Sequence, residues 1–137
     1  MFRHGTLAIV TLAVVAVVAA HGQDKKEEKK AKPLYVHAVI FYLKKDAPKD
    51  AVETFIKDVH EMLEVIPSVK GIWVGRPADK GTPDFAKKDY DVGLVVLFDN
   101  YDGLKEYLDH AKHVAFVKKH GKYFETVNVF DFMDQKK

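Results

Sequence analysis

Four stretches of this 137-residue chain carry the apolar, β-branched and aromatic residues that favour extended backbone. The first and third alternate most clearly between two sets of side chains, as a strand with two distinct faces does. Turn-forming residues separate the stretches from their neighbours. The pattern therefore predicts four strands, at residues 34–43, 69–74, 90–98 and 124–132.

Two further segments repeat their apolar residues at helical spacing. The first runs from Val52 to Ile66 as one stripe, with Pro48 suited to the first turn and Pro67 ending the helix. The second starts after several candidate N-caps at residues 99–102 and ends before Gly121. The order β-α-β-β-α-β predicts an α+β fold of the ferredoxin-like kind, with a four-stranded antiparallel sheet and both helices on one face.

The predicted sheet is apolar on both faces, although helices on one side can cover only one of them. A large uncovered apolar face is typical of an interface between protein chains. We therefore expect a second copy of the sheet to pack against it, which gives a homodimer with two-fold symmetry. The uncovered face is expected to carry these residues: His37, Val39, Phe41, Leu94, Val127 and Val129.

The N-terminal region differs in composition from the rest of the chain. A run of small and aliphatic residues follows a short basic start and ends in small residues at Ala20 and Gly22, which predicts a secretory signal peptide. The alternative is an uncleaved anchor, but the run is shorter than the roughly 20 residues that span a membrane. We expect an exported protein, periplasmic or secreted, with no membrane contact after cleavage. The predicted organisation is a leader at 1–22, a charged linker at 23–32 and one domain at 33–137.

Composition excludes several classes of function. The chain has 22 basic and 20 acidic residues, so no strongly basic surface for nucleic acid is expected. It has no cysteine, which excludes thiolate metal sites and cysteine nucleophiles. It also lacks a glycine-rich phosphate loop, and we expect no cofactor.

Four residues spaced by threes are the strongest candidates for chemistry: Tyr107, His110, His113 and Phe116. Each residue of an α-helix advances by about 100°, so Tyr107 and His113 would point roughly 120° apart on a regular helix. A break at residues 109–112 would bring them onto one side. A neutral imidazole can then take a proton while a phenol donates to an oxygen on which charge builds.

The histidines also allow a metal-site interpretation, because three-residue spacing can bring two imidazoles together. No carboxylate motif accompanies His110, His113 and the more distant His120. A capping or solvated role for these histidines is therefore favoured, and no metal is expected. His37, on an apolar strand face, is either a core histidine bonded to a neighbour or part of a pocket wall.

The chain carries five segments in an order and at a spacing that are familiar from one family: residues 37–44, 66–69, 75–77, 107–116 and 130–132. Together they resemble the stress-responsive dimeric α/β barrel (Dabb) family. The resemblance covers residues 34–132 and implies a ferredoxin-like protomer and a homodimer whose two sheets close a central barrel. It does not imply a reaction, because one fold hosts many functions.

The chain is also similar to the polyketide cyclases of that family. This similarity implies that Tyr107 and His113 are catalytic and that Asp131 orients the imidazole. Val59 and Val92 stand where the cyclase has polar residues, and Ala111 stands where the family often has proline. The pocket that the similarity implies is lined by His37, Val39, Phe41, Phe55, Leu94, Phe116, Phe124, Val127 and Val129.

Two hypotheses follow for the function. The first is an exported barrel domain with a stress-related role that binds a small apolar or aromatic ligand without catalysis. The second is a cofactor-independent enzyme, a cyclase or a monooxygenase, that uses Tyr107 and His113 as an acid–base pair. The second requires both side chains to open into one shared cavity.

Overall fold

The computed structural model describes residues 34–135, so the predicted leader and linker lie outside the described residues. Within this part of the chain, no helix is long and apolar enough to cross a membrane. The elements follow in the order β1 (Tyr35–Leu43), α1 (Ala51–Asp58), η1 (Val59–Leu63), β2 (Gly71–Gly75), β3 (Val92–Phe98), α2 (Tyr101–Asp109), α3 (Ala111–His120), η2 (Gly121–Tyr123) and β4 (Phe124–Met133).

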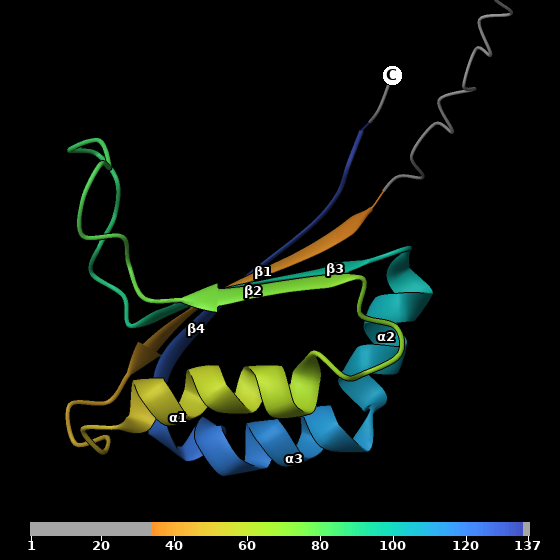
Figure 1. Cartoon of the computed structure of the whole chain (residues 1–137), viewed down its shortest axis with the longest axis horizontal. Coiled ribbons are helices and arrows are strands. Elements are labelled where there is room, and N and C mark those ends of the chain that lie inside the picture. The colour runs from red at the N-terminus through yellow and green to blue at the C-terminus, as the bar shows by residue number, and fades with distance from the viewer. Residues whose placement is uncertain (1–33, 136–137) are drawn as a thin grey trace, which may run out of the picture. The chain divides into compact units, whose positions relative to one another are not determined.

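The strands form one antiparallel sheet in the order β2-β3-β1-β4. The helices all lie on one side of this sheet, and the long loop between β2 and β3 projects on the other side (Figure 1). This is the split βαβ topology in which each helix connects two strands that are not neighbours. The predicted α+β, ferredoxin-like fold is confirmed.

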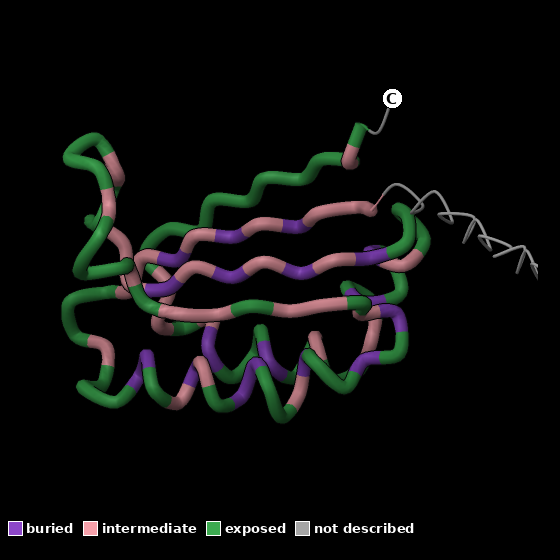
Figure 2. Tube along the Cα trace, turned by 45° about the horizontal axis from the view of Figure 1, so that its top comes forward, coloured by how far each residue is buried: buried purple, intermediate pink, exposed green. Residues whose placement is uncertain are grey.

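The helices cover the sheet face that was predicted to be uncovered, so that prediction is wrong. Val39 and Leu94 are each 3% exposed and belong to the core beneath the helices, as does Phe41. The open face carries the alternate positions, among them Trp73, Phe130 and Phe132, which are exposed. Figure 2 shows the alternation along β1 and β3, whereas β4 is exposed over nearly its whole length. Because both faces are apolar, alternation alone could not identify the covered one.

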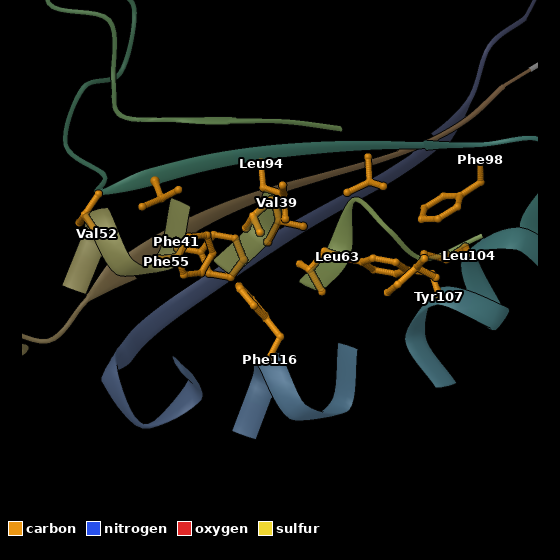
Figure 3. Packing of buried hydrophobic residues seen from close by; sticks show 14 residues of the cluster. Val39, Phe41, Val52, Phe55, Leu63, Leu94, Phe98, Leu104, Tyr107 and Phe116 are labelled. Carbon is orange, nitrogen blue, oxygen red and sulfur yellow. The ribbon is translucent and has the colours of Figure 1, made fainter. Parts of the chain in front are cut away.

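An aromatic cluster joins the helices to the sheet. The Phe55 ring lies 4.8 Å from Phe41 on β1 and 5.0 Å from Phe116 on α3, measured between ring centroids (Figure 3). Phe124, at the start of β4, lies 5.0 Å from Phe41. Edge-to-face and tilted pairs at this spacing add to the free energy gained by burying the rings. The aromatic cluster therefore joins β1, α1, α3 and β4.

The first helical stripe is not one regular helix. It begins as α1 and continues from Val59 as a π-helical turn, η1, before the chain turns towards Pro67. Leu63 and Ile66 are each only 1% exposed, so the predicted apolar stripe is buried despite the change of pitch. Single π-turns within helices are frequent at functional sites, where they redirect side chains.

A buried ionic cluster fastens α1 to α3. Asp58 Oδ2 lies 2.7 Å from His120 Nε2 and 2.6 Å from Lys119 Nζ, and its side chain is 7% exposed. Burial raises the pKa of Asp58, but hydrogen bonds from Lys119 and His120 outweigh burial and hold the pKa below its usual range. The folded state therefore favours the ionised carboxylate.

We predict that Asp58→Ala lowers the free energy of unfolding by about 3 kcal/mol at neutral pH, because it leaves two donors without their acceptor. The folded pKa is depressed, so the stabilisation is present above the unfolded value of about 3.9 and is lost as pH falls through the folded pKa. Urea unfolding of both proteins at neutral and acidic pH measures the difference. Glu61→Ala, which removes an exposed partner of Lys57, is the control and should cost at most about 0.5 kcal/mol. The prediction is contradicted if the difference in unfolding free energy between the wild type and Asp58→Ala does not decrease at acidic pH.

Candidate functional site

The helix break that the site requires is present. α2 ends at Asp109, His110 has extended backbone with φ −67° and ψ 137°, and α3 begins at Ala111. The Nδ1 atom of His110 accepts a hydrogen bond from the backbone N–H of Lys112 at 3.2 Å, so this imidazole caps α3. The capping role predicted for His110 is confirmed, and the break forms without the proline that Ala111 replaces.

The break brings Tyr107 and His113 together. Their ring centroids lie 4.6 Å apart, although the two residues belong to different helices. Both line one cavity of about 260 Å³ between the sheet and the helices. The shared opening that the enzyme hypothesis requires is therefore present.

This sheet–helix cavity is apolar along most of its wall and polar at one end. Strands β1, β3 and β4 form one wall, and helices α2 and α3 face it with one residue of η1. The cavity is lined by His37, Val39, Phe41, Leu63, Leu94, Tyr107, Leu108, His113, Phe116, Val117, Phe124, Val127 and Val129.

The Tyr107 side chain is almost entirely buried, at 1% exposure. Burial raises the pKa of the Tyr107 phenol above its usual value, so the hydroxyl keeps its proton at neutral pH. Within residues 34–135 the hydroxyl has no protein hydrogen-bond partner. It is therefore free to donate a hydrogen bond to an oxygen of a bound molecule.

His113 is held in its neutral form. Burial lowers the pKa of the His113 imidazole and the nearby His37 lowers it further, while a hydrogen bond to the Leu108 carbonyl opposes both. That bond joins Nδ1 to the Leu108 oxygen at 3.1 Å. A carbonyl only accepts, so Nδ1 carries the proton and Nε2 carries a lone pair.

The predicted partner of Asp131 is wrong. Asp131 does not orient His113; its Oδ1 atom lies 2.7 Å from Nδ1 of His37. The cause is the strand register, because His37 on β1 pairs directly with Asp131 on β4. Both interpretations of His37 hold in part. Its side chain is hydrogen-bonded to a neighbour, and it also lines the cavity.

The other predicted site residues either line the cavity or lie outside it. Phe55 and Asp131 do not line the cavity: Phe55 lies in the aromatic cluster, and Asp131 lies beside His37. The remaining predicted pocket residues do line it. Three lining residues were not predicted: Leu63, Leu108 and Val117. Leu63 was part of the first helical stripe, while Leu108 and Val117 each adjoin a residue of the spaced quartet.

The three histidines considered for a metal site do different things. His110 caps α3 and His113 lines the cavity. His120 is buried against the Asp58 carboxylate, so the predicted capping or solvated role is wrong for His120. Among residues 34–135, no group of three side chains is arranged to hold a metal ion.

A ferredoxin-like protomer with a cavity between its helices and its sheet defines the class of protein. The family model described as "Stress responsive A/B Barrel Domain" (Dabb) matches residues 36–134. The chain belongs to this family.

Similar proteins include enzymes and proteins of unknown function. Olivetolic acid cyclase of Cannabis sativa is 22% identical over 100 residues, which cover 73% of this chain and 96% of the cyclase. A Dabb protein from Mesorhizobium loti with a ferredoxin-like fold is 25% identical, with a TM-score of 0.61 over 76% of this chain and 99% of that one. A dimeric ferredoxin-like protein of unknown function from Bacteroides fragilis is 26% identical, with a TM-score of 0.57 over 72% and 94% of the two chains.

We predict that the imidazole of His113 titrates below about 6.5, the usual value for histidine, because burial disfavours its charged form. It should therefore be neutral at neutral pH. A proton NMR titration of the histidine ring signals measures this, and His113→Gln identifies the signal by its disappearance. A midpoint at or above the usual value contradicts the buried, neutral site.

Proposed function

We propose that this domain binds a small apolar or aromatic molecule in the sheet–helix cavity, with an oxygen of that molecule at Tyr107. The observation that carries the proposal is the cavity itself, which is apolar except for Tyr107, His37 and His113 at one end. Small-molecule sites are usually apolar pockets with a few convergent polar groups that fix the orientation of the ligand.

The polar end limits the kind of ligand. Among residues 34–135 the Tyr107 hydroxyl has no hydrogen-bond partner, and His113 offers a lone pair at Nε2. A ligand without polar atoms would leave both groups unpaired in a buried place, which costs free energy. A phenol can satisfy both, since its oxygen accepts from Tyr107 and its O–H can donate to Nε2 of His113. The oxygen of a carbonyl compound can accept from Tyr107 only.

We predict that the protein binds para-hexylphenol about tenfold more tightly than hexylbenzene, because only the phenol pairs with the buried polar groups. In the Tyr107→Phe variant, the preference for the phenol over hexylbenzene should decrease. Isothermal titration calorimetry with both compounds measures it. Equal affinity for the two compounds in the wild-type protein contradicts the proposal.

Val127→Trp is the variant that tests the location. Val127 lines the cavity and is 41% exposed, so a larger side chain can fill the opening without overpacking the core. Binding should weaken at least about tenfold, as loss of apolar contact predicts. Val65→Trp changes another exposed valine that does not line the cavity, and should leave binding unchanged.

A second candidate function is acid–base catalysis on the bound molecule, without a cofactor. The specific observation is a neutral imidazole beside a protonated phenol in one cavity. Such a pair can remove a proton next to a carbonyl and stabilise the oxygen on which charge builds. The similarity to olivetolic acid cyclase agrees with this candidate. Tyr107→Phe should abolish any turnover without dissociating the protein.

We further propose that the domain is a homodimer joined through its open sheet face. The exposed apolar side chains of Trp73, Phe130 and Phe132 lie on this face. Monomeric proteins rarely leave such a patch uncovered. The related protein from Bacteroides fragilis is dimeric, and a sheet face that matches its own copy gives two-fold symmetry.

We predict that Trp73→Glu converts the dimer into a monomer at micromolar concentration, because it places a charge in an apolar interface. Light scattering coupled to size-exclusion chromatography gives the mass. Val65→Glu on another surface should leave the dimer intact. A wild-type protein that is already monomeric at that concentration refutes the proposed homodimer.

A further inference from the structure

The polar end of the sheet–helix cavity holds a second imidazole, and this one is backed by a carboxylate. His37 lies on β1, is 7% exposed and lines the cavity. Its Nδ1 atom lies 2.7 Å from Asp131 Oδ1 on β4. Its ring meets the ring of Tyr107 edge-on, at 6.2 Å between centroids. Tyr107 therefore contacts two imidazoles, His37 and His113.

Hydrogen-bond chemistry fixes the tautomer of both rings. A neutral imidazole has one N–H and one nitrogen with a lone pair. The partner of His37 is a carboxylate and the partner of His113 is a carbonyl, and both accept only. Nδ1 is therefore the donor in each ring, and Nε2 is the nitrogen that can receive a proton.

The two rings differ in what stabilises a proton that arrives at Nε2. At His37 the new positive charge is next to the Asp131 carboxylate, and an opposite charge favours the charged form. At His113 the one hydrogen-bond partner within the described residues is the Leu108 carbonyl, and burial of the ring favours its neutral form. The titratable groups that face His37 or Asp131 are Tyr107 on α2, His113 on α3 and Tyr35 on β1.

We propose that His37, oriented by Asp131, is the group that accepts a proton from a ligand in this cavity. The ligand's C–H or O–H bond breaks, the proton binds to Nε2 of His37, and the electron pair stays on the ligand as an enolate or a phenolate. Tyr107 donates a hydrogen bond to the oxygen that becomes negative, and His113 remains neutral beside it. The charge of the imidazolium is balanced by Asp131, and no electron is gained or lost.

This assignment rests on the proposed acid–base function and makes His37, in place of His113, the base that removes the proton. It also narrows the ligand to a weak acid, either a phenol or a carbonyl compound with an adjacent C–H. Asp131 does not line the cavity, so it is a positioning residue that acts through His37. A carboxylate behind a histidine stabilises both the reactive tautomer and the imidazolium that forms.

The test is long-range proton–nitrogen NMR of the histidine rings in the full chain. In the wild-type protein, His37 should carry its proton on Nδ1, where Asp131 accepts it. In Asp131→Asn the tautomer should become mixed, whereas Asp131→Glu should restore the proton to Nδ1. If His37 of the wild-type protein carries its proton on Nε2, the assignment is overturned.

The chain offers a matched control on an exposed helix surface. His60 Nδ1 lies 2.7 Å from Glu64 Oε2, which is another histidine–carboxylate pair at the same distance. Glu64→Gln should change the His60 signals and leave those of His37 unchanged. A change at His37 in this control as large as in Asp131→Asn would overturn the specific role of Asp131.

Kinetics with nitrobenzisoxazole give a second measurement, because this flat aromatic compound opens to a coloured phenolate when a base removes its ring proton. His37→Gln should slow the reaction about 100-fold, which is the usual contribution of a general base. Asp131→Asn should slow it and change its pH profile, while Glu64→Gln should change neither. Equal rates for wild type and His37→Gln count against the proposal.

Binding of para-hexylphenol, measured on the same samples, separates the two proposals. A protein that binds the phenol but has His37 in the other tautomer overturns the assignment of the base and keeps the ligand-binding function. A protein with the expected tautomers that does not bind the phenol keeps the His37–Asp131 arrangement and refutes the proposed ligand.

Discussion

One residue of extended backbone, His110, decides where the candidate functional side chains lie. With ψ near 137° it ends α2 and starts α3, and the rings of Tyr107 and His113 come within 4.6 Å across the break. In a continuous helix the same residues would point roughly 120° apart. The imidazole of His110 caps the new helix, so a residue that resembled a metal ligand has a backbone role instead. The polar end of the cavity depends on this break.

The one-sided placement of the helices shapes the rest of the molecule. It buries the inward residues of β1 and β3, while β4 stays exposed, with Val127 and Val129 on the cavity wall. The cavity exists because the helices do not cover this edge of the sheet closely. The opposite face, with Trp73 and Phe130, is left for a second copy. Because the helices lie on one side, the proposed ligand-binding surface and the proposed dimer surface are on opposite faces of the sheet.

Local signals were enough to predict the fold, because strand alternation, helical spacing and capping residues depend on near neighbours in the sequence. The helix break at residues 109–112 was expected only because a working site required it, since no residue there compels it. Two features could not be predicted in this way. The covered face was misassigned because Val39 and Ala38 lie on opposite faces that are both apolar. The partner of Asp131 was misassigned because it depends on the register between β1 and β4, which are far apart in the sequence. The resemblance to cyclases supplied the residues of the site but not their hydrogen bonds.

The central claim is that a small aromatic molecule binds between the sheet and the helices with its oxygen at Tyr107. The most direct measurement is the set of intermolecular nuclear Overhauser effects from the ring of bound para-hexylphenol. The account predicts contacts with the rings of Tyr107 and His113 and with the methyl groups of Val127. Contacts with Trp73 and Phe130 on the open face, without contacts to Tyr107, would contradict it.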